Sequence, residues 1–180
     1  MAARPILKMG TPSLFAPSVP WPEDKFDSKA LHALLADMKD SMAAAHGAGL
    51  AAPQIGENVR VVIFEVANNL RYPDREPIPF TVLINPSIEP IGADLVDGWE
   101  GCLSVPGLRG VVSRPERIRY TGRNEKGETI DRTVDGFHAR VVQHECDHLD
   151  GILYPMRVKD FTRFGYTDIL FPELAAFDDD

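Results

Sequence analysis

The order of helix-like and strand-like segments is the feature that most limits how this sequence can fold. Apolar residues recur with helical spacing in residues 27–45 and again after Gly136, and the chain between these segments is rich in β-forming residues. The β-rich runs are residues 59–66, 80–90, 116–122 and 128–135. Because no regular βαβ alternation occurs, the pattern favours an α+β fold. We expect largely antiparallel sheets packed around a central helix.

Cap and turn residues mark the ends of these segments. Asp27 or Ser28 can cap the first helix, and Gly47 can end it. The sequence NEKG at residues 124–127 lies between the last two β-rich runs and predicts a hairpin. Gly151 stands where a C-terminal cap of the second helix is expected. Between Gly136 and Gly151, the helical spacing places His144 and His148 on the same face as the apolar residues Phe137 and Val141.

The composition is typical of a soluble globular protein. A chain of 180 residues with 44% hydrophobic residues can bury one core, so we expect residues 1–180 to form a single domain. The formal net charge of −8 argues against broad binding to nucleic acid or to an anionic membrane, since both require basic patches. The sequence has no signal-peptide pattern and no apolar run approaching the roughly 20 residues of a membrane span. We therefore expect a cytoplasmic protein.

The sequence QHECDH at residues 143–148 is the strongest chemical signal. On a helix, His144 and His148 lie on one face, and Glu145 can reach a water molecule on a metal that they hold. The alternative is that both histidines are hydrogen-bonded inside the core. A metzincin would have a third histidine where this chain has Tyr154, which disfavours that family. A third ligand is therefore expected upstream.

Cys102 is the upstream candidate. The chain has only two cysteines, Cys102 and Cys146, which is too few for a disulfide-stapled protein. The sequence EGCLSVPG at residues 100–107 is typical of a loop between turns. A lone cysteine is more often a buried thiol, and a nucleophilic one would need a histidine base. The HExxH pattern favours a third interpretation, a Cys-His-His metal site with water in the fourth position.

The segment HGAGLAAPQIG at residues 46–56 joins the first helix to the first β-rich run through small residues. A flexible loop would explain its glycines but not the many alanine and leucine residues between them. Such a segment allows a substrate backbone to lie against it as an added strand. The side-chain amide of Gln54, near its end, could point at developing negative charge.

Three motifs together resemble those of one enzyme family. The sequences GAGLAAPQ at residues 47–54, EGCLS at 100–104 and QHECDH at 143–148 are similar, in order and separation, to the motifs of the peptide deformylases. The resemblance covers nearly the whole chain. It implies a metal-dependent hydrolase that removes the formyl group from the N-terminal N-formylmethionine of newly synthesised polypeptides and releases formate.

The resemblance also implies a metal site. Cys102, His144 and His148 would hold one divalent ion, which in this family is generally Fe2+, although Zn2+, Ni2+ or Co2+ can occupy the site. The donor set by itself suits zinc and iron comparably well.

Catalytic roles are implied in the same way. Glu145 would be the general acid and base, taking a proton from the attacking water and passing it to the departing amine. The side chain of Gln54 and the backbone N–H of Leu103 would stabilise the oxyanion, together with the metal.

The resemblance further implies a peptide-binding strip and a side-chain pocket. Backbone groups at Ala48, Gly49 and Gly101 would hold the main chain of the substrate, so that many sequences after the methionine are accepted. The methionine side chain would enter a pocket at Phe137 and Val141.

Three other positions bear on this pocket. Arg109 matches a family arginine near the mouth of the site, and the alternative is a surface charge. Gly98 and Arg140 depart from the aliphatic lining of the best-known bacterial members. These two departures bear on the depth and selectivity of the pocket. The alternative for Arg140 is that it faces outward or forms a structural ion pair.

The partners implied are N-formylmethionyl nascent peptides. Some members dock on the ribosome through a long basic C-terminal helix, whereas this chain ends with FPELAAFDDD at residues 171–180. An acidic tail cannot contact RNA phosphates in that way, so any ribosome proximity would not depend on it. Two other functions are weaker: a zincin-type endopeptidase, opposed by Tyr154 and by Cys102, and a non-catalytic structural zinc protein, opposed by Glu145 and Gln54.

Overall fold

The computed structural model describes residues 3–66 and 76–172. The helices are α1 (Lys29–Ala44), α2 (Gly136–Leu149) and α3 (Thr167–Leu170). The strands are β1 (Gly49–Ala51), β2 (Val61–Val66), β3 (Ile78–Pro90), β4 (Leu95–Cys102), β5 (Val105–Pro115), β6 (Arg117–Arg123), β7 (Thr129–Asp135) and β8 (Phe164–Tyr166). Short 3-10 helices lie in the connections: η1 (Pro12–Phe15), η2 (Glu23–Lys25), η3 (Ala52–Ile55), η4 (Tyr154–Arg157) and η5 (Phe161–Arg163).

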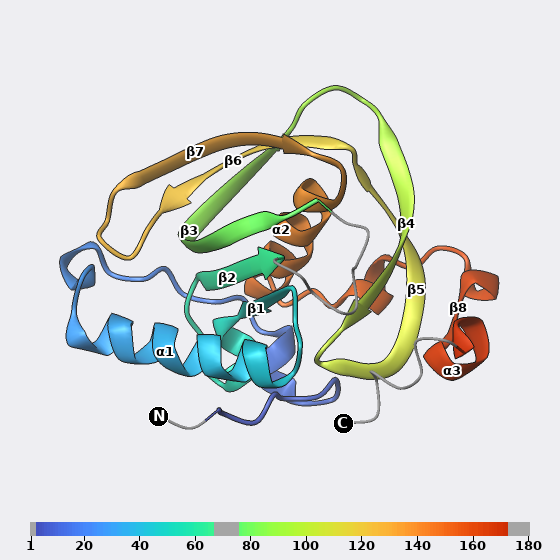
Figure 1. The fold of residues 1–180 in the computed structure, drawn as a ribbon, viewed down its shortest axis with the longest axis horizontal. Coiled ribbons are helices and arrows are strands. Elements are labelled where there is room, and N and C mark those ends of the chain that lie inside the picture. The colour runs from blue at the N-terminus through green and yellow to red at the C-terminus, as the bar shows by residue number, and fades with distance from the viewer. Residues whose placement is uncertain (1–2, 67–75, 173–180) are drawn as a thin grey trace.

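The strands form two antiparallel sheets. One sheet has the order β1-β2-β3-β6-β7 and the other has the order β4-β5-β8. The helix α2 lies at the centre of the molecule, with β2 and β3 on one side and the long β4-β5 hairpin on another (Figure 1). The predicted α+β fold with largely antiparallel sheets is therefore confirmed.

In the part of the first sheet formed by β1, β2 and β3, one face packs on α1 and the other face packs on α2, which explains the continuous apolar run in β2. Along this strand, Val61 and Ile63 pack into a cluster with the apolar face of α1. Their neighbours Val62 and Phe64 point to the opposite face and pack into a cluster with α2. Successive side chains of a strand point to opposite faces of the sheet. When both faces are buried, consecutive positions of the strand are therefore apolar, and the usual alternation of apolar and polar residues is absent.

The ends of α1 follow the cap signals. The side chain of Ser28 accepts a hydrogen bond from the backbone N–H of Leu31 at 3.2 Å, which satisfies one free donor of the first turn. At the other end, His46 has a φ of +52°, and the N–H of Gly47 donates to the carbonyl of Met42 at 2.9 Å. Of the two predicted caps, Asp27 and Ser28, the structure has Ser28, and the predicted end near Gly47 is confirmed.

The helix α2 begins directly after β7, at Gly136, and its apolar side faces the first sheet. Its residues Ala139, Val142 and Cys146 are buried against the strands. The helix ends before Gly151, which has a φ of +71° and packs so closely on the backbone that a Cβ would lie 2.5 Å from the carbonyl oxygen of Phe15. Only glycine fits both conditions, so this residue determines where the chain leaves α2.

The prediction of a loop at residues 100–107 is wrong. Residues Leu95–Cys102 and Val105–Pro115 form the hairpin β4-β5, and Cys102 pairs with Val105 across a turn that contains Leu103 and Ser104. The segment 46–56 likewise contains β1 and η3. Glycine and acidic residues lower the β propensity of β4, but pairing with β5 along its whole length outweighs that weak preference.

The acidic end of the chain, residues 173–180, lies outside the described residues, so the prediction about ribosome docking concerns the sequence alone. Within residues 3–66 and 76–172, no helix has the length and apolar character needed to cross a membrane.

Replacement of Leu83 by alanine tests the core between β3 and α2. Leu83 is completely buried in the cluster that contains α2, so the truncation removes apolar contacts and leaves a cavity. We expect the free energy of unfolding, measured by urea denaturation, to fall by about 2–5 kcal/mol. The matched control Leu95→Ala affects a residue that is 61% exposed. Its effect should be below about 0.5 kcal/mol, and equal losses in the two variants would contradict this core.

Candidate active site

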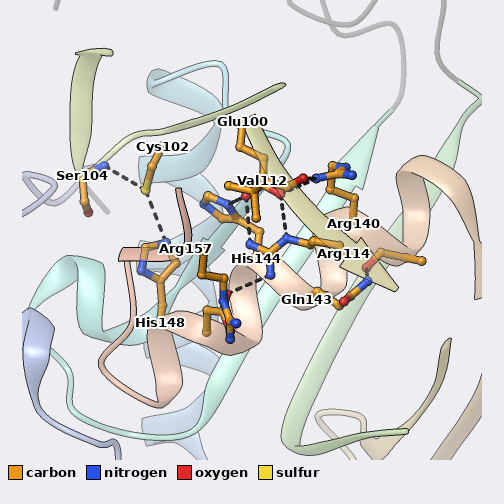
Figure 2. Close-up of polar contacts among 12 residues, drawn as sticks. Glu100, Cys102, Ser104, Val112, Arg114, Arg140, Gln143, His144, His148 and Arg157 are labelled. Atoms are coloured by element: carbon orange, nitrogen blue, oxygen red, sulfur yellow. Dashed lines mark hydrogen bonds and ion pairs between the residues drawn. The ribbon is translucent and has the colours of Figure 1, made fainter. Parts of the chain in front are cut away.

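Three side chains with metal-binding atoms converge where β4 meets α2. The ligand atoms of Cys102, His144 and His148 all lie within 4.8 Å of one another. The helix supplies the two histidines from consecutive turns of one face, and the end of β4 supplies the cysteine. Its Sγ lies 3.3 Å from Nε2 of His148 (Figure 2). The structure therefore brings together the predicted ligand residues, although Cys102 is more than forty positions from either histidine in the sequence.

A buried carboxylate orients one of these histidines. Nδ1 of His144 donates to Oε2 of Glu100 at 2.9 Å, which leaves Nε2 of the ring free to face the cluster. Arg114 donates to both oxygens of Glu100, at 2.6 and 2.8 Å. Burial by itself would raise the pKa of Glu100, but the hydrogen bonds from Arg114 and His144 outweigh it and hold the pKa well below its usual range. Glu100 is therefore an ionised acceptor that fixes the tautomer of His144.

The carboxylate of Glu100 belongs to a chain of ion pairs that crosses the interior. Arg114 also donates to Asp147 at 2.9 Å, and Asp147 accepts two further hydrogen bonds from Arg157 at 2.5 Å each. At the other end, Arg140 donates to Glu100 at 2.8 Å. The chain of ion pairs links β4, β5, α2 and η4 around the histidines.

Glu100, Arg114 and Ser104 are residues of the site whose roles were not predicted from the sequence. Glu100 belongs to a motif that was interpreted as a loop. In the β4-β5 hairpin it pairs with Gly110, whereas Arg114 pairs with Val96, so the two hydrogen-bonded residues are not directly opposite each other. A correct prediction of that hairpin would have placed both side chains on one face of it.

The cluster fits a divalent cation in its chemistry and its charge. A thiolate and two neutral imidazoles suit zinc and first-row transition metals. Burial lowers the pKa of His148 well below its usual value and so keeps this ring neutral. Burial also acts to lower the pKa of His144, but Cys102 and Glu100 outweigh it and raise that pKa well above the usual value. Cys102 and Glu100 thus both favour positive charge on or beside the ring of His144.

The carboxyl group of Glu145 lies beside this cluster and is 5% exposed. Its Oε2 atom has no hydrogen-bond partner among the described residues. A Cβ at position 49 would overlap the carboxyl group, so Gly49 is the residue that lets β1 lie against it. Burial raises the pKa of Glu145 to about 7. A buried carboxyl oxygen without a partner, in this position, is free to bind water or a substrate.

The side-chain amide of Gln54 is held in one orientation. Its Oε1 accepts from the N–H of Ala51 at 2.8 Å, so Nε2 must point the other way. Nε2 donates to Oγ of Ser104 at 3.0 Å and lies 3.6 Å from Sγ of Cys102. The backbone N–H of Ser104 also approaches that sulfur, at 3.4 Å. Gln54 therefore presents an N–H donor at the edge of the cluster.

One cavity of about 370 Å³ collects the predicted site. His148 is completely buried and is not part of the lining. The lining includes every other predicted site residue: Ala48, Gly49, Gln54, Gly101, Cys102, Leu103, Arg109, Phe137, Val141, His144 and Glu145. Arg109 is buried, so the alternative of a surface charge is wrong. A Cβ at Gly101 would lie 2.9 Å from Cζ of Arg109, which shows how closely this strand end and the arginine pack.

Comparison with known proteins agrees with this geometry. Residues 3–164 match the family model described as polypeptide deformylase. The chain is 63% identical over 177 residues to peptide deformylase 2 of Ralstonia nicotianae, an alignment that covers 98% of this chain and 99% of that protein. It is 58% identical over 176 residues to peptide deformylase 1 of Nitrosomonas europaea, again with 98% and 99% covered.

Solved structures show the same fold. A class I type b peptide deformylase from Acinetobacter baumannii, bound to the compound K4U, superposes with a TM-score of 0.85 at 36% identity and covers 88% of this chain and 100% of that one. A second structure of that enzyme, bound to Met-Ala-Ser, gives a TM-score of 0.83 at 37% identity over 87% and 98% of the two chains. This chain belongs to the polypeptide deformylase family, the metal-dependent hydrolases that remove the N-formyl group from nascent peptides.

Proposed function

We propose that this chain deformylates N-formylmethionyl peptides in the cavity between β1, β4 and α2, with Glu145 as the group that moves the proton. The observation that carries the proposal is the carboxyl oxygen of Glu145, buried without a partner among the described residues beside the Cys-His-His cluster. A structural metal site would need no such group. The same arrangement argues against the endopeptidase alternative, because the third ligand atom belongs to Cys102, upstream of the helix.

We propose that Cys102, His144 and His148 hold the divalent ion. A bound divalent ion supplies Lewis-acid chemistry, lowering the pKa of water and polarising the formyl oxygen. Fe2+ is the ion proposed, from the resemblance of the motifs, and the donor set is also compatible with Zn2+, Ni2+ or Co2+. Glu100 supports the assignment, since its hydrogen bond to Nδ1 of His144 holds that ring in the ligating orientation.

Glu145 is proposed to act first as a base and then as an acid. It accepts a proton from the water that attacks the formyl carbon, and it returns the proton to the nitrogen of the departing amine. Its pKa of about 7, raised by burial, lies near the pH at which such an exchange is most effective. A positive charge at the neighbouring cluster would favour the ionised form, which is the form needed for the first step.

The oxyanion that forms on the formyl oxygen needs hydrogen-bond donors in fixed positions. Gln54 is proposed as one donor, because the backbone of Ala51 already holds its carbonyl oxygen and so directs its amide N–H groups toward Cys102. The backbone N–H of Leu103, in the turn of the β4-β5 hairpin, is proposed as the second donor. Donors that are oriented before the reaction need no reorganisation when the charge develops.

The peptide chain of the substrate is proposed to lie between β1 and the end of β4. Backbone groups at Ala48, Gly49 and Gly101 line the cavity there and could pair with it as an added strand. The methionine side chain would then point toward α2, where Phe137 and Val141 line the same cavity. The bound Met-Ala-Ser in the Acinetobacter baumannii structure supports a peptide of that length as a test substrate.

Replacement of Glu145 by glutamine tests the proton carrier. We expect kcat for release of formate from formyl-Met-Ala-Ser to fall by about 10³-fold or more, because glutamine cannot accept the proton. Metal content should be unchanged, since Glu145 is not among the proposed ligands. The matched control is Glu89→Gln, whose side chain is 70% exposed, and it should keep wild-type activity. A wild type that binds metal but releases no formate would overturn the proposed function.

Replacement of Gln54 by alanine tests the oxyanion donor. We expect kcat to fall by about 10²- to 10³-fold with a smaller change in KM, because the lost hydrogen bond strengthens only as the oxyanion forms. The control is Gln143→Ala, which removes another buried amide that lies outside the cavity. That variant should lose stability rather than kcat, so similar kcat values for the two variants would contradict the role of Gln54.

Metal analysis tests the proposed ion. Protein purified without oxygen should contain about one Fe per chain and should lose activity in air, because a ferrous thiolate site is oxidised. The zinc-substituted protein should keep its lower activity in air, and Cys102→Ser should lower the metal content of both forms. Zinc as the bound ion, together with air-stable activity in the anaerobically purified protein, would contradict the assignment of iron.

A further inference from the structure

Arg140 lies in the wall of the cavity at a point where it joins α2 to the second sheet. It lines the cavity together with Phe137 and Val141, its neighbours on α2. Its Nη1 donates to Oε1 of Glu100 at 2.8 Å and to the carbonyl of Val112 at 2.9 Å (Figure 2). At this point of the cavity wall the guanidinium group therefore joins α2 to β4 and β5.

A third hydrogen bond holds the group on the other side. Nη2 of Arg140 donates to the carbonyl of Val96 at 2.7 Å. The acceptors thus belong to β4 and β5, whereas the side chain comes from α2. Movement of the guanidinium would break its hydrogen bonds to two backbone carbonyls and remove one of the four hydrogen bonds that the buried carboxylate of Glu100 accepts, which costs more than the movement of an apolar side chain. Arg140 is a rigid part of the wall.

Gly98 provides the room for this group. A Cβ at position 98 would lie 2.7 Å from Cζ and 2.8 Å from Nε of Arg140, too close for any side chain while the guanidinium keeps its place. Gly98 is not one of the described glycines that have a positive φ, so its lack of a side chain provides space rather than an unusual backbone conformation. It also pairs with Val112, whose carbonyl accepts from Arg140.

We infer that Arg140 and Gly98 form a matched pair that limits the length of the first side chain the pocket accepts. The inference rests on the proposed function and extends it to substrate selection. A rigid polar wall cannot yield to a longer side chain, and an apolar chain end pressed on a guanidinium gains nothing from its N–H donors. The pair therefore accepts methionine and rejects a side chain that is one methylene longer.

The test compares two peptides that differ by this methylene, formyl-Met-Ala-Ser and formyl-ethionyl-Ala-Ser, on the metal-loaded protein. One methylene in a fitted pocket is worth roughly 10-fold or more in kcat/KM, so the wild type should prefer the methionine peptide by at least about 10-fold. Arg140→Leu shortens the wall and should reduce this preference to below about 3-fold. The control Arg119→Leu removes an arginine that pairs with Asp131 on the surface of β6-β7 and should leave the preference unchanged.

The ratio of the two peptides separates the pocket from the metal centre. Loss of Arg140 also removes one hydrogen bond to Glu100, the carboxylate that accepts from His144. An effect of this loss on the metal ligand His144 would lower kcat/KM for both peptides equally. A wild type that uses both peptides equally well would overturn the inference. An unchanged ratio in Arg140→Leu would also overturn the inference but would leave the proposed function intact. If the wild type released no formate from the methionine peptide, both the proposed function and the inference would be overturned.

A second substitution tests the pairing itself. Gly98→Ala should displace the guanidinium and lower kcat/KM for the methionine peptide by about 10-fold, but should have little effect in the Arg140→Leu background, because the two sites are in contact. Equal effects in both backgrounds would overturn the pairing. If Arg140→Leu does not fold, Arg140→Lys takes its place in both comparisons, since one ammonium group cannot reach the three acceptors and the ratio again decides.

Discussion

The buried carboxylate of Glu100 is the interaction on which the rest of the site depends. Its two oxygens accept four hydrogen bonds, two from Arg114 and one each from Arg140 and His144. A buried charge is costly unless it is paired and hydrogen-bonded, so these partners together are what stabilise this carboxylate in the core. The same bonds fasten the β4-β5 hairpin to α2. The position of Cys102, at the end of β4, therefore depends on the group that orients His144.

The parts of the site that were predicted are those encoded in short stretches of sequence. His144, Glu145 and His148 are separated by less than one and a half helical turns, so helical periodicity alone places them. Cys102 was found through a motif rather than through a predicted strand, and the hairpin that carries it was interpreted as a loop. Its glycines and acidic residues have low β propensity, and the stabilising partners lie on other elements.

The ion pairs around the site could not be predicted for a related reason. Asp147 lies in the QHECDH motif on α2, but its partners Arg114 and Arg157 belong to β5 and η4. Such pairings depend on which side chains the tertiary fold brings together, and pattern rules for helices and strands contain no information about that. The net charge of −8 likewise did not predict the local charge of the cavity. The cavity lining includes four arginine or lysine residues and two glutamates: Arg4, Lys8, Arg109, Arg140, Glu100 and Glu145.

Two glycines in strands illustrate how the fold makes space for charged groups. Gly49 in β1 lies where a Cβ would overlap the carboxyl group of Glu145, and Gly98 in β4 lies where a Cβ would overlap the guanidinium of Arg140. Neither is among the described glycines with positive φ, so the local backbone would accept another residue. Glycine weakens a strand, because it adds backbone entropy to the unfolded state and packs no side chain. The two strands therefore lose some intrinsic stability at the positions where they approach the ionisable groups of the cavity most closely. In exchange, the carboxyl group of Glu145 and the guanidinium group of Arg140 occupy the space that side chains of β1 and β4 would otherwise fill.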